Sequence, residues 1–376
     1  MIKKIILLLF LSISFMTNAQ YSTFNHGGLN REYIYHEPLN LAANSPLIFV
    51  MHGYSEDAST IEWYSGFNAI ADSVGFAVCY PRGINDFLGN RFFNVGYDFH
   101  IGIETVDDLS FLEALATHLQ TIHGLDSNRT YATGLSNGGD MCYKIACQGS
   151  GVFKATAAVA GMMLEDIQDS CTNNISIPIL EIHGTDDNVT YYDGDMNNTG
   201  GWGAYAAIDT MMFFFANRNS YTSFQSLNLP DINSSDGSTV TCLKYTNPSN
   251  CNDVWLYRVV GGGHDWPGSS GNMDINSSVE IWNFFQTVYC NGFTIIDEGS
   301  QSEFFNFFPN PFNNILNINI SKEATIELFN NNGSKIKEII CSERSVSIDL
   351  SDLSSGIYIL RATINKEQIT KKIIKQ

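Results

Sequence analysis

Residues 134–139 read GLSNGG and lie between the apolar run RTYAT and the stretch MCYKIAC, whose apolar spacing is helical. The pattern fits G-x-S-x-G, in which a serine occupies a sharp turn from a strand into a helix. The backbone is strained at such a turn, so the positions two before and two after Ser136 must be very small, and Gly134 and Gly138 occupy them. An ordinary glycine-rich loop can look the same, so Ser136 needs support from the rest of the chain.

Short apolar runs alternate with helical patterns between residues 46 and 260. The runs are PLIFVMHG, FAVCYPRG, RTYATG, ATAAVAG, IPILEIHG and WLYRVVGGG. Unbroken apolar runs are typical of strands buried on both faces, as in a parallel sheet covered by helices. A crossover helix is predicted in TVDDLSFLEALATHLQTIHG, with a capping-box-like start at Thr105 and Asp108 and an end at Gly124. The sequence therefore predicts an α/β fold with a mostly parallel central sheet flanked by helices.

Two later strand ends also carry reactive side chains. LEIHGTDDNVTYY contains Asp186 and Asp187, and RVVGGGHDWPG contains His264. Serine, aspartate, histidine is the chain order of α/β-hydrolases. A serine hydroxyl needs an imidazole to take its proton, and the imidazole needs a carboxylate to fix its tautomer. Ser136, His264 and one of the two aspartates are therefore a candidate catalytic triad.

Acyl transfer through a serine also needs amide donors for the oxyanion. We expect one to be the N–H of Asn137 and the other to be the N–H of Tyr54, in the turn MHGYS that follows an earlier strand. Trp266 and His52 are candidate substrate contacts, although His52, like His183, more often serves to bond the backbone near a strand end. The spacings give no metal site, and the proposed chemistry needs no metal or organic cofactor.

The charge is concentrated in one part of the chain. Residues 20–290 hold 29 acidic and 9 basic side chains, a net charge of −20, whereas residues 291–376 hold 10 and 9, a net charge of −1. Such acidity repels nucleic acids and anionic membranes at long range. We therefore expect no nucleic-acid partner.

The chain opens with MIKKIILLLFLSISFMTNAQ, which has the layout of a secretory signal peptide over residues 1–19. No other segment offers a membrane span. Export permits disulfides, and Cys147 with Cys171 and Cys242 with Cys251 are plausible local pairs. Cys79 lies in a strand-like run and is expected to be a buried thiol.

The hydrophobic pattern of the sequence changes after Cys290. Residues 291–305 have little periodicity and are predicted to form a linker, which leaves residues 20–290 as one catalytic domain. From residue 306 the chain shows short alternating strands separated by turns, as in ILNINIS, ATIELFNNNGSKIKEII and GIYILRATI. This pattern predicts a small all-β sandwich over residues 306–376.

Residues 46–290 resemble the secreted polyhydroxybutyrate depolymerase and feruloyl or acetyl-xylan esterase group of α/β-hydrolases. The matching blocks are PLIFVMHGYSED, YPRG, VDDLSFL, DSNRTYATGLSNGGDM, AAVAG, LEIHGTDDNVTYYDG and VVGGGHDWPG. The resemblance implies a serine ester hydrolase that works through an acyl-enzyme, with Ser136 as nucleophile, His264 as base and Asp187, rather than Asp186, as acid. The implied substrate is an ester, on a polyhydroxyalkanoate or on a feruloylated or acetylated polysaccharide.

Residues 306–376 resemble the C-terminal sorting domain of the type IX secretion system of Bacteroidetes. FFPNPFNN, LSDLSSGIYIL and the basic ending TKKIIKQ carry the resemblance. It implies a partner, the type IX machinery, and export across the inner and outer membranes of a Gram-negative bacterium to the cell surface or the medium. The alternative for this segment is a carbohydrate-binding or spacer sandwich.

Two departures from the esterase pattern lie near the expected mouth of the site. Tyr54 stands where many relatives have cysteine, and residues 190–192 read TYY where VPY is frequent, so the substrate pocket is expected to differ. Two other functions stay open. One is a serine peptidase of the prolyl oligopeptidase type, which shares an HGTDDNV-like block, and the other is an inactive surface binding protein on a hydrolase scaffold.

Overall fold

The computed structural model describes residues 21–172 and 175–288 and, further along the chain, residues 305–308, 312–320, 324–330, 335–341, 345–354, 356–364 and 367–375. The predicted signal peptide and nearly all of the predicted linker lie outside these residues. The chain divides into two compact units, Met1–Cys290 and Asn291–Gln376, and each is described by itself. None of the helices in the described part is long and apolar enough to cross a membrane.

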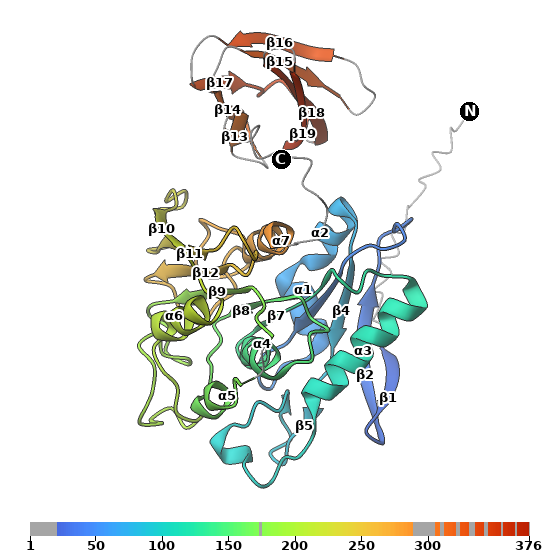
Figure 1. The fold of residues 1–376 in the computed structure, drawn as a ribbon, viewed down its shortest axis with the longest axis vertical. Helices are drawn as coiled ribbons and strands as arrows, with labels where there is room; N and C mark the ends of the chain where they lie inside the picture. Colours follow the sequence, from blue (N-terminus) through green and yellow to red (C-terminus); the bar gives the residue numbers. More distant parts are fainter. Residues whose placement is uncertain are drawn as a thin grey trace, which may run out of the picture. The chain divides into compact units, whose positions relative to one another are not determined.

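The first unit is built on a ten-stranded sheet with the order β1-β2-β4-β3-β7-β8-β9-β12-β11-β10 (Figure 1). The six central strands run parallel to one another. They are β4 (Ala77–Pro81), β3 (Leu47–Met51), β7 (Thr130–Leu135), β8 (Ala155–Val159), β9 (Ile179–Gly184) and β12 (Val254–Val260). Antiparallel strands complete the edges, namely β1 (Ser22–His26) and β2 (Leu29–His36) on one side, β11 (Thr239–Thr246) and β10 (Ser223–Asn228) on the other. The predicted mostly parallel sheet is confirmed.

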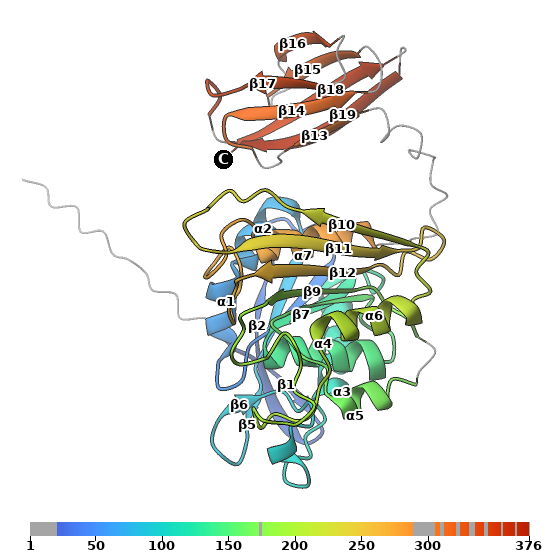
Figure 2. The same cartoon turned by 90° about the vertical axis from the view of Figure 1, so that its left-hand side faces the viewer.

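Helices cover both faces of this sheet (Figures 1 and 2). One apolar core includes side chains of α1 (Ala58–Ser65), α2 (Phe67–Val74) and α7 (Ser277–Thr287). The other includes side chains of α3 (Asp108–His123), α4 (Asn137–Gln148), α5 (Glu165–Asp169) and α6 (Ile208–Arg218). Every residue of β3, β4, β7, β8 and β9 is buried, which agrees with the mostly apolar composition of these strands. A short hairpin of β5 (Ile84–Asn85) and β6 (Arg91–Phe92) and the 3-10 turn η1 (Asp98–His100) lie between β4 and α3.

The predicted crossover helix is present as α3, but the predicted capping box of Thr105 and Asp108 is wrong. The N-cap is Asp107, whose carboxylate accepts the N–H three residues further on at 3.0 Å. Asp108 is fully buried and accepts a hydrogen bond from Arg31 at 2.5 Å, so its side chain is committed to the core rather than to the helix start. Gly124 ends the helix as predicted, with φ of 63°.

The second unit consists of two antiparallel sheets. One has the order β13 (Phe305–Phe308), β14 (Ile315–Ile320), β17 (Ser345–Asp349). The other has the order β16 (Lys335–Cys341), β15 (Ala324–Phe329), β18 (Gly356–Ile364), β19 (Glu367–Lys375). Buried side chains of both sheets, among them Ile318 and Leu360, form one core, as expected for the predicted small all-β sandwich.

The cysteines bear out one predicted disulfide and exclude the other. Cys147 and Cys171 are bonded, and Cys79 is a buried free thiol, as predicted. The predicted bridge between Cys242 and Cys251 is wrong. Cys242 points into the core beneath β11 as a free thiol, while Cys251 is disulfide-bonded without it.

Candidate active site

Ser136 lies between the end of β7 and the start of α4, with φ of 53° and ψ of −118°. A side chain at positive φ is strained, and such strain costs about 1–3 kcal/mol unless the surroundings enforce it. Here the backbone is held on both sides of the turn. The Ser136 N–H donates to the carbonyl oxygen of Val159 at 2.8 Å, and the Ser136 carbonyl accepts the N–H of Asp140 at 2.8 Å.

The glycines around Ser136 are required by close backbone contacts. A Cβ on Gly134 would lie 2.6 Å from the carbonyl carbon of Gly138, and a Cβ on Gly138 would lie 2.4 Å from the carbonyl oxygen of Met51. Both separations are shorter than side chains tolerate, so the expectation of tiny residues at these positions is confirmed. A Cβ on Gly139 would lie 3.1 Å from Gly161 Cα, which reflects the predicted close packing of α4 on the sheet.

Two of the other strand ends bring Asp187 and His264 together. Asp187 follows β9 and His264 follows β12, its parallel neighbour in the sheet. His264 Nδ1 lies 2.7 Å from Asp187 Oδ2, while the Asp187 Oδ1 accepts the N–H groups of Val189 and Thr190 at 2.8 Å each. Asp186, the other candidate, is exposed and accepts a hydrogen bond from the Thr185 hydroxyl.

The carboxylate of Asp187 is held in its charged form. Burial raises the pKa of Asp187, but hydrogen bonds from His183 and His264 lower it by more, so that its pKa lies well below the usual range. An ionised carboxylate at this position stabilises a proton on His264 Nδ1. The pair can therefore present the second ring nitrogen of His264 for proton exchange.

A second buried pair, Glu181 and His183, lies next to Asp187. The sequence predicted only a structural role for His183 and nothing for Glu181. His183 Nε2 lies 2.9 Å from the carbonyl oxygen of Thr190, which can only accept, and 3.4 Å from Asp187 Oδ2. His183 Nδ1 lies 2.8 Å from Glu181 Oε1. Burial alone would lower the pKa of His183, but hydrogen bonds and charges of Asp187 and Glu181 raise it. The sequence signal for this pair was its position inside the strand LEIHG, two residues apart on one face.

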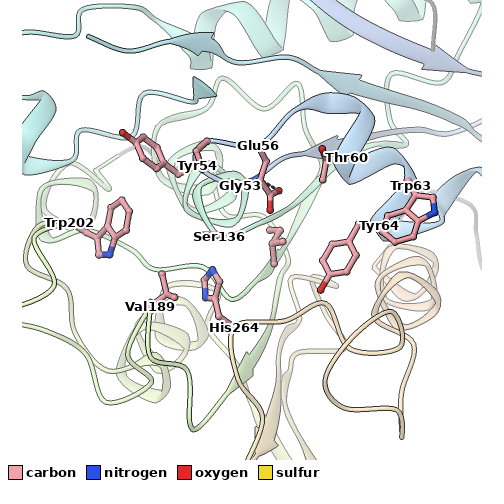
Figure 3. A pocket seen from close by; sticks show the side chains of 12 residues that line it. Gly53, Tyr54, Glu56, Thr60, Trp63, Tyr64, Ser136, Val189, Trp202 and His264 are labelled. Carbon is pink, nitrogen blue, oxygen red and sulfur yellow. Dashed lines mark hydrogen bonds between the residues drawn. The ribbon is translucent and has the colours of Figure 1, made fainter. Parts of the chain in front are cut away.

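Ser136 and His264 line one cleft of about 460 Å³. Figure 3 shows Ser136 in the middle of the cleft, His264, Val189 and Trp202 on one side, and residues of α1 on the other. No hydrogen bond joins the Ser136 hydroxyl to His264 among the described residues, although both side chains open onto the same space. Such bonds are often long or poorly aligned before substrate binds.

The turn after β3 supplies the wall of the cleft next to Ser136. Gly53, Tyr54, Ser55 and Glu56 all line it. In the described part of the chain the N–H of Tyr54 donates to no protein acceptor, and the N–H of Asn137 is the first of helix α4, which has no partner within the helix. The Asn137 side chain is engaged elsewhere, since its oxygen accepts the N–H of Phe93 at 2.7 Å.

Neither of the two candidate substrate contacts lines the cleft. The His52 ring is fully buried, with Nδ1 donating to the carbonyl oxygen of Gly53 at 2.8 Å and Nε2 accepting the N–H of Gly83 at 2.9 Å. Trp266 is also fully buried, and its Nε1 donates to the Ser278 hydroxyl at 3.0 Å. With their polar groups used inside the protein, neither side chain is available to substrate, and we do not retain them as contacts.

The cleft residues that the sequence did not reveal come from α1 and from the loop before α6. Thr60, Trp63 and Tyr64 project from α1, and Trp202 packs its ring edge-on against Tyr54 with centroids 5.6 Å apart. Nothing in a single sequence marks these aromatic residues, because aromatic side chains in a helix or loop are far more often part of the core. Glu56 lies in the block MHGYSED, but its position beside Ser136 depends on the tertiary fold.

Comparison with known proteins fits this geometry. Residues 32–208 match the family described as Esterase PHB depolymerase, and residues 306–376 match the Secretion system C-terminal sorting domain. A bifunctional acetylxylan esterase/xylanase of Neocallimastix patriciarum is 28% identical over 44% of this chain and 22% of that protein. A poly(3-hydroxyalkanoate) depolymerase C of Paucimonas lemoignei is 30% identical over 38% of this chain and 34% of that protein. This chain thus spans about a fifth and a third of these two relatives.

A solved acetyl xylan esterase of Aspergillus awamori superposes with a TM-score of 0.51 over 71% of this chain and 98% of that one, at 15% identity, which shows a shared fold. A putative esterase of Nocardia uniformis subsp. tsuyamanensis is 26% identical over 61% of this chain and 68% of that protein. The chain therefore has an α/β-hydrolase fold in which residues 32–208 match the PHB depolymerase esterase family, and its residues 306–376 match a secretion-system sorting domain.

Proposed function

We propose that the protein is a secreted serine carboxylic-ester hydrolase that works through an acyl-enzyme. The observation that carries the proposal is that Ser136, on a strained turn at the start of α4, shares its cleft with a histidine whose Nδ1 is fixed by the buried Asp187. The helix start at Asn137 also favours negative charge beside the serine.

The reaction begins when the Ser136 Oγ attacks the ester carbonyl and its proton passes to His264 Nε2. Asp187 stabilises the resulting imidazolium, and the N–H groups of Tyr54 and Asn137 donate to the oxyanion. The bond to the alcohol then breaks, and the alcohol leaves with the proton from His264. Water, deprotonated by His264, then attacks the acyl-enzyme carbonyl. The resulting tetrahedral intermediate breaks down, releases the acid, and Ser136 Oγ regains its proton from His264.

Two features support the wider assignment. The relatives include proteins named for acetylxylan, feruloyl and poly(3-hydroxyalkanoate) esters, so a polymer-linked ester is the proposed substrate. The sorting domain supports export by the type IX machinery to the cell surface or the medium, where such polymers occur.

The test is hydrolysis of 4-nitrophenyl acetate by the wild type and by Ser136→Ala, with unfolding curves of both. We expect turnover in the wild type and a loss of at least about 10³-fold in the variant, because the nucleophile is removed while most of the fold is untouched. Asp231→Asn, an exposed change outside the cleft, is the control and should keep wild-type turnover. Turnover retained by Ser136→Ala would contradict the proposal, as would hydrolysis of proline-containing peptide amides in preference to esters.

A further inference from the structure

Glu56 places a carboxylate directly beside the proposed nucleophile. A Cβ on Gly53 would lie 3.2 Å from Glu56 Oε2 and 3.5 Å from Ser136 Cβ, so the carboxylate and the serine are neighbours across Gly53. Glu56 is half-buried and lines the same cleft as Ser136 and His264 (Figure 3). None of the catalytic steps above uses this side chain.

The geometry of the turn leaves one oxygen of Glu56 free. Glu56 Oε2 accepts the N–H of Gly53 at 3.1 Å, and the Glu56 N–H donates to the Gly53 carbonyl at 3.2 Å, which fixes the side chain over the turn. Oε1 forms no hydrogen bond with any group in the described part of the chain. A carboxylate carries several acceptor positions, so most of its capacity to accept hydrogen bonds is unused in this structure.

The charge of Glu56 is likewise not compensated by a neighbouring cation. Two arginines pair instead with the next residue, Asp57, whose Oδ2 lies 2.6 Å from Arg82 and 3.1 Å from Arg91. Within residues 21–172 and 175–288, no lysine, arginine or histidine forms an ion pair with Glu56. A substrate that fills the cleft must therefore either supply donors to this carboxylate or remove water from it without replacement, which is costly.

We propose that Glu56 makes the cleft select esters whose alcohol part carries free hydroxyl groups, as acylated polysaccharides do, over polyesters of hydroxy acids, whose repeat units carry none. This inference rests on the proposed esterase function. A sugar hydroxyl next to the acylated position donates to Glu56 Oε1 and replaces the lost water. The repeat units of a polyhydroxyalkanoate offer ester oxygens and apolar groups but no hydrogen-bond donor, so they leave the carboxylate desolvated and repel it with their own oxygens.

The aromatic residues of the cleft fit the same substrate class. Trp63 is 81% exposed at the edge of the cleft and stacks nearly parallel to Tyr64, with an interplanar angle of 20°. Trp202 lines the opposite wall (Figure 3). Flat indole faces pack against the C–H faces of sugar rings while the ring hydroxyls stay free to form hydrogen bonds at the edge, where Glu56 lies.

The experiment measures kcat/KM on acetylated xylan and on 4-nitrophenyl acetate, which has no hydroxyl group, for the wild type, Glu56→Ala, Glu56→Gln and Asp231→Asn. Initial rates on a poly(3-hydroxybutyrate) suspension are measured beside them. We expect the ratio of xylan to nitrophenyl activity to fall at least about tenfold in Glu56→Ala, since a hydrogen bond to a charged group is lost. In Glu56→Gln the amide oxygen keeps the bond to Gly53 while the charge is removed, so the ratio should fall at least about threefold. The exposed Asp231→Asn should leave it unchanged.

Two results would overturn the selection by Glu56. One is an equal loss on both soluble substrates in both Glu56 variants, which would mean that the residue only holds the turn. The other is a wild type that degrades poly(3-hydroxybutyrate) faster than acetylated xylan, or that hydrolyses 4-nitrophenyl acetate but not acetylated xylan. Failure of the esterase function itself is a different result, because the wild type would then show no nitrophenyl activity that depends on Ser136.

Discussion

His264 Nδ1 lies 2.7 Å from the Oδ2 of the buried Asp187, whereas Asp186, the preceding residue, is exposed to solvent. The sequence offers two adjacent carboxylates, and the backbone after β9 turns only one of them toward His264. The N–H groups of Val189 and Thr190 hold that carboxylate in place from its other oxygen.

Replacing each aspartate singly by asparagine tests whether only Asp187 serves His264. Asp187→Asn should lower kcat on 4-nitrophenyl acetate by about 10⁴-fold, because an amide stabilises the wrong tautomer of His264. Asp186→Asn serves as the matched control and should stay within about threefold of the wild type, as expected for an exposed surface change. The opposite order of effects would show that the acid had been assigned to the wrong neighbour.

The buried His183 should make stability depend on pH. Its pKa is raised from 6.5 to about 10 in the folded protein, because hydrogen bonding to Asp187 and Glu181 outweighs burial. A raised folded pKa contributes stability that is complete below about pH 6.5 and is lost as the pH rises toward 10. His183→Asn should therefore lower the free energy of unfolding more at pH 6 than at pH 10, measured by urea denaturation. A difference that does not change with pH would contradict the charged state of His183.

Two neighbouring glycines should differ in their tolerance of alanine. Gly138→Ala would bring a Cβ to 2.4 Å from the Met51 carbonyl oxygen, so the turn must move, at a cost of about 2–3 kcal/mol and with a large loss of esterase activity. Gly139→Ala, with its nearest contact at 3.1 Å, should cost about 1 kcal/mol and retain more activity. Thermal unfolding and nitrophenyl acetate assays of both variants check this order, and equal effects would argue against the close approach of α4 to β3.

The disulfide between Cys147 and Cys171 should stabilise the first unit. It closes a loop with a sequence separation of 24, for which the chain-entropy model gives about 3 kcal/mol. The double variant Cys147→Ser/Cys171→Ser should lose about that much free energy of unfolding, and Cys242→Ala, which removes a free buried thiol, should lose about 1 kcal/mol. A double variant as stable as the single control would rule out a stabilising role for this bond.

The sequence predicted the sheet well because its strands are buried on both faces. The run around β3 is apolar throughout and those around β7 and β9 are mostly apolar, and a motif of the type G-x-S-x-G fixes where one strand turns into a helix. The helix start at α3 was misplaced by two residues, since only the folded core shows that Asp108 pairs with Arg31. Local capping patterns cannot reveal such a long-range ion pair.

The clustering of the candidate catalytic residues could be predicted from chain order, whereas the residues that line the cleft depend on packing and could not. Ser136 and His264 follow from strand ends, but the burial of His52 and Trp266 depends on tertiary neighbours that no local pattern encodes. The predicted pairing of Cys242 with Cys251 failed for the same reason, because Cys242 packs in the core as a free thiol and Cys251 is disulfide-bonded without it. The position of Glu56 beside Ser136 could not be predicted, because it depends on the fold that brings Gly53 next to Ser136.

The most direct test of the central claim is the site at which a fluorophosphonate modifies the protein, located by mass spectrometry of the intact chain and its peptides. Only an activated serine reacts quickly with this reagent. The account predicts stoichiometric modification of Ser136 in the wild type, no modification of Ser136→Ala at the same exposure, and strongly slowed modification of His264→Ala. An unmodified wild type, or labelling that persists unchanged in Ser136→Ala or His264→Ala, would contradict it.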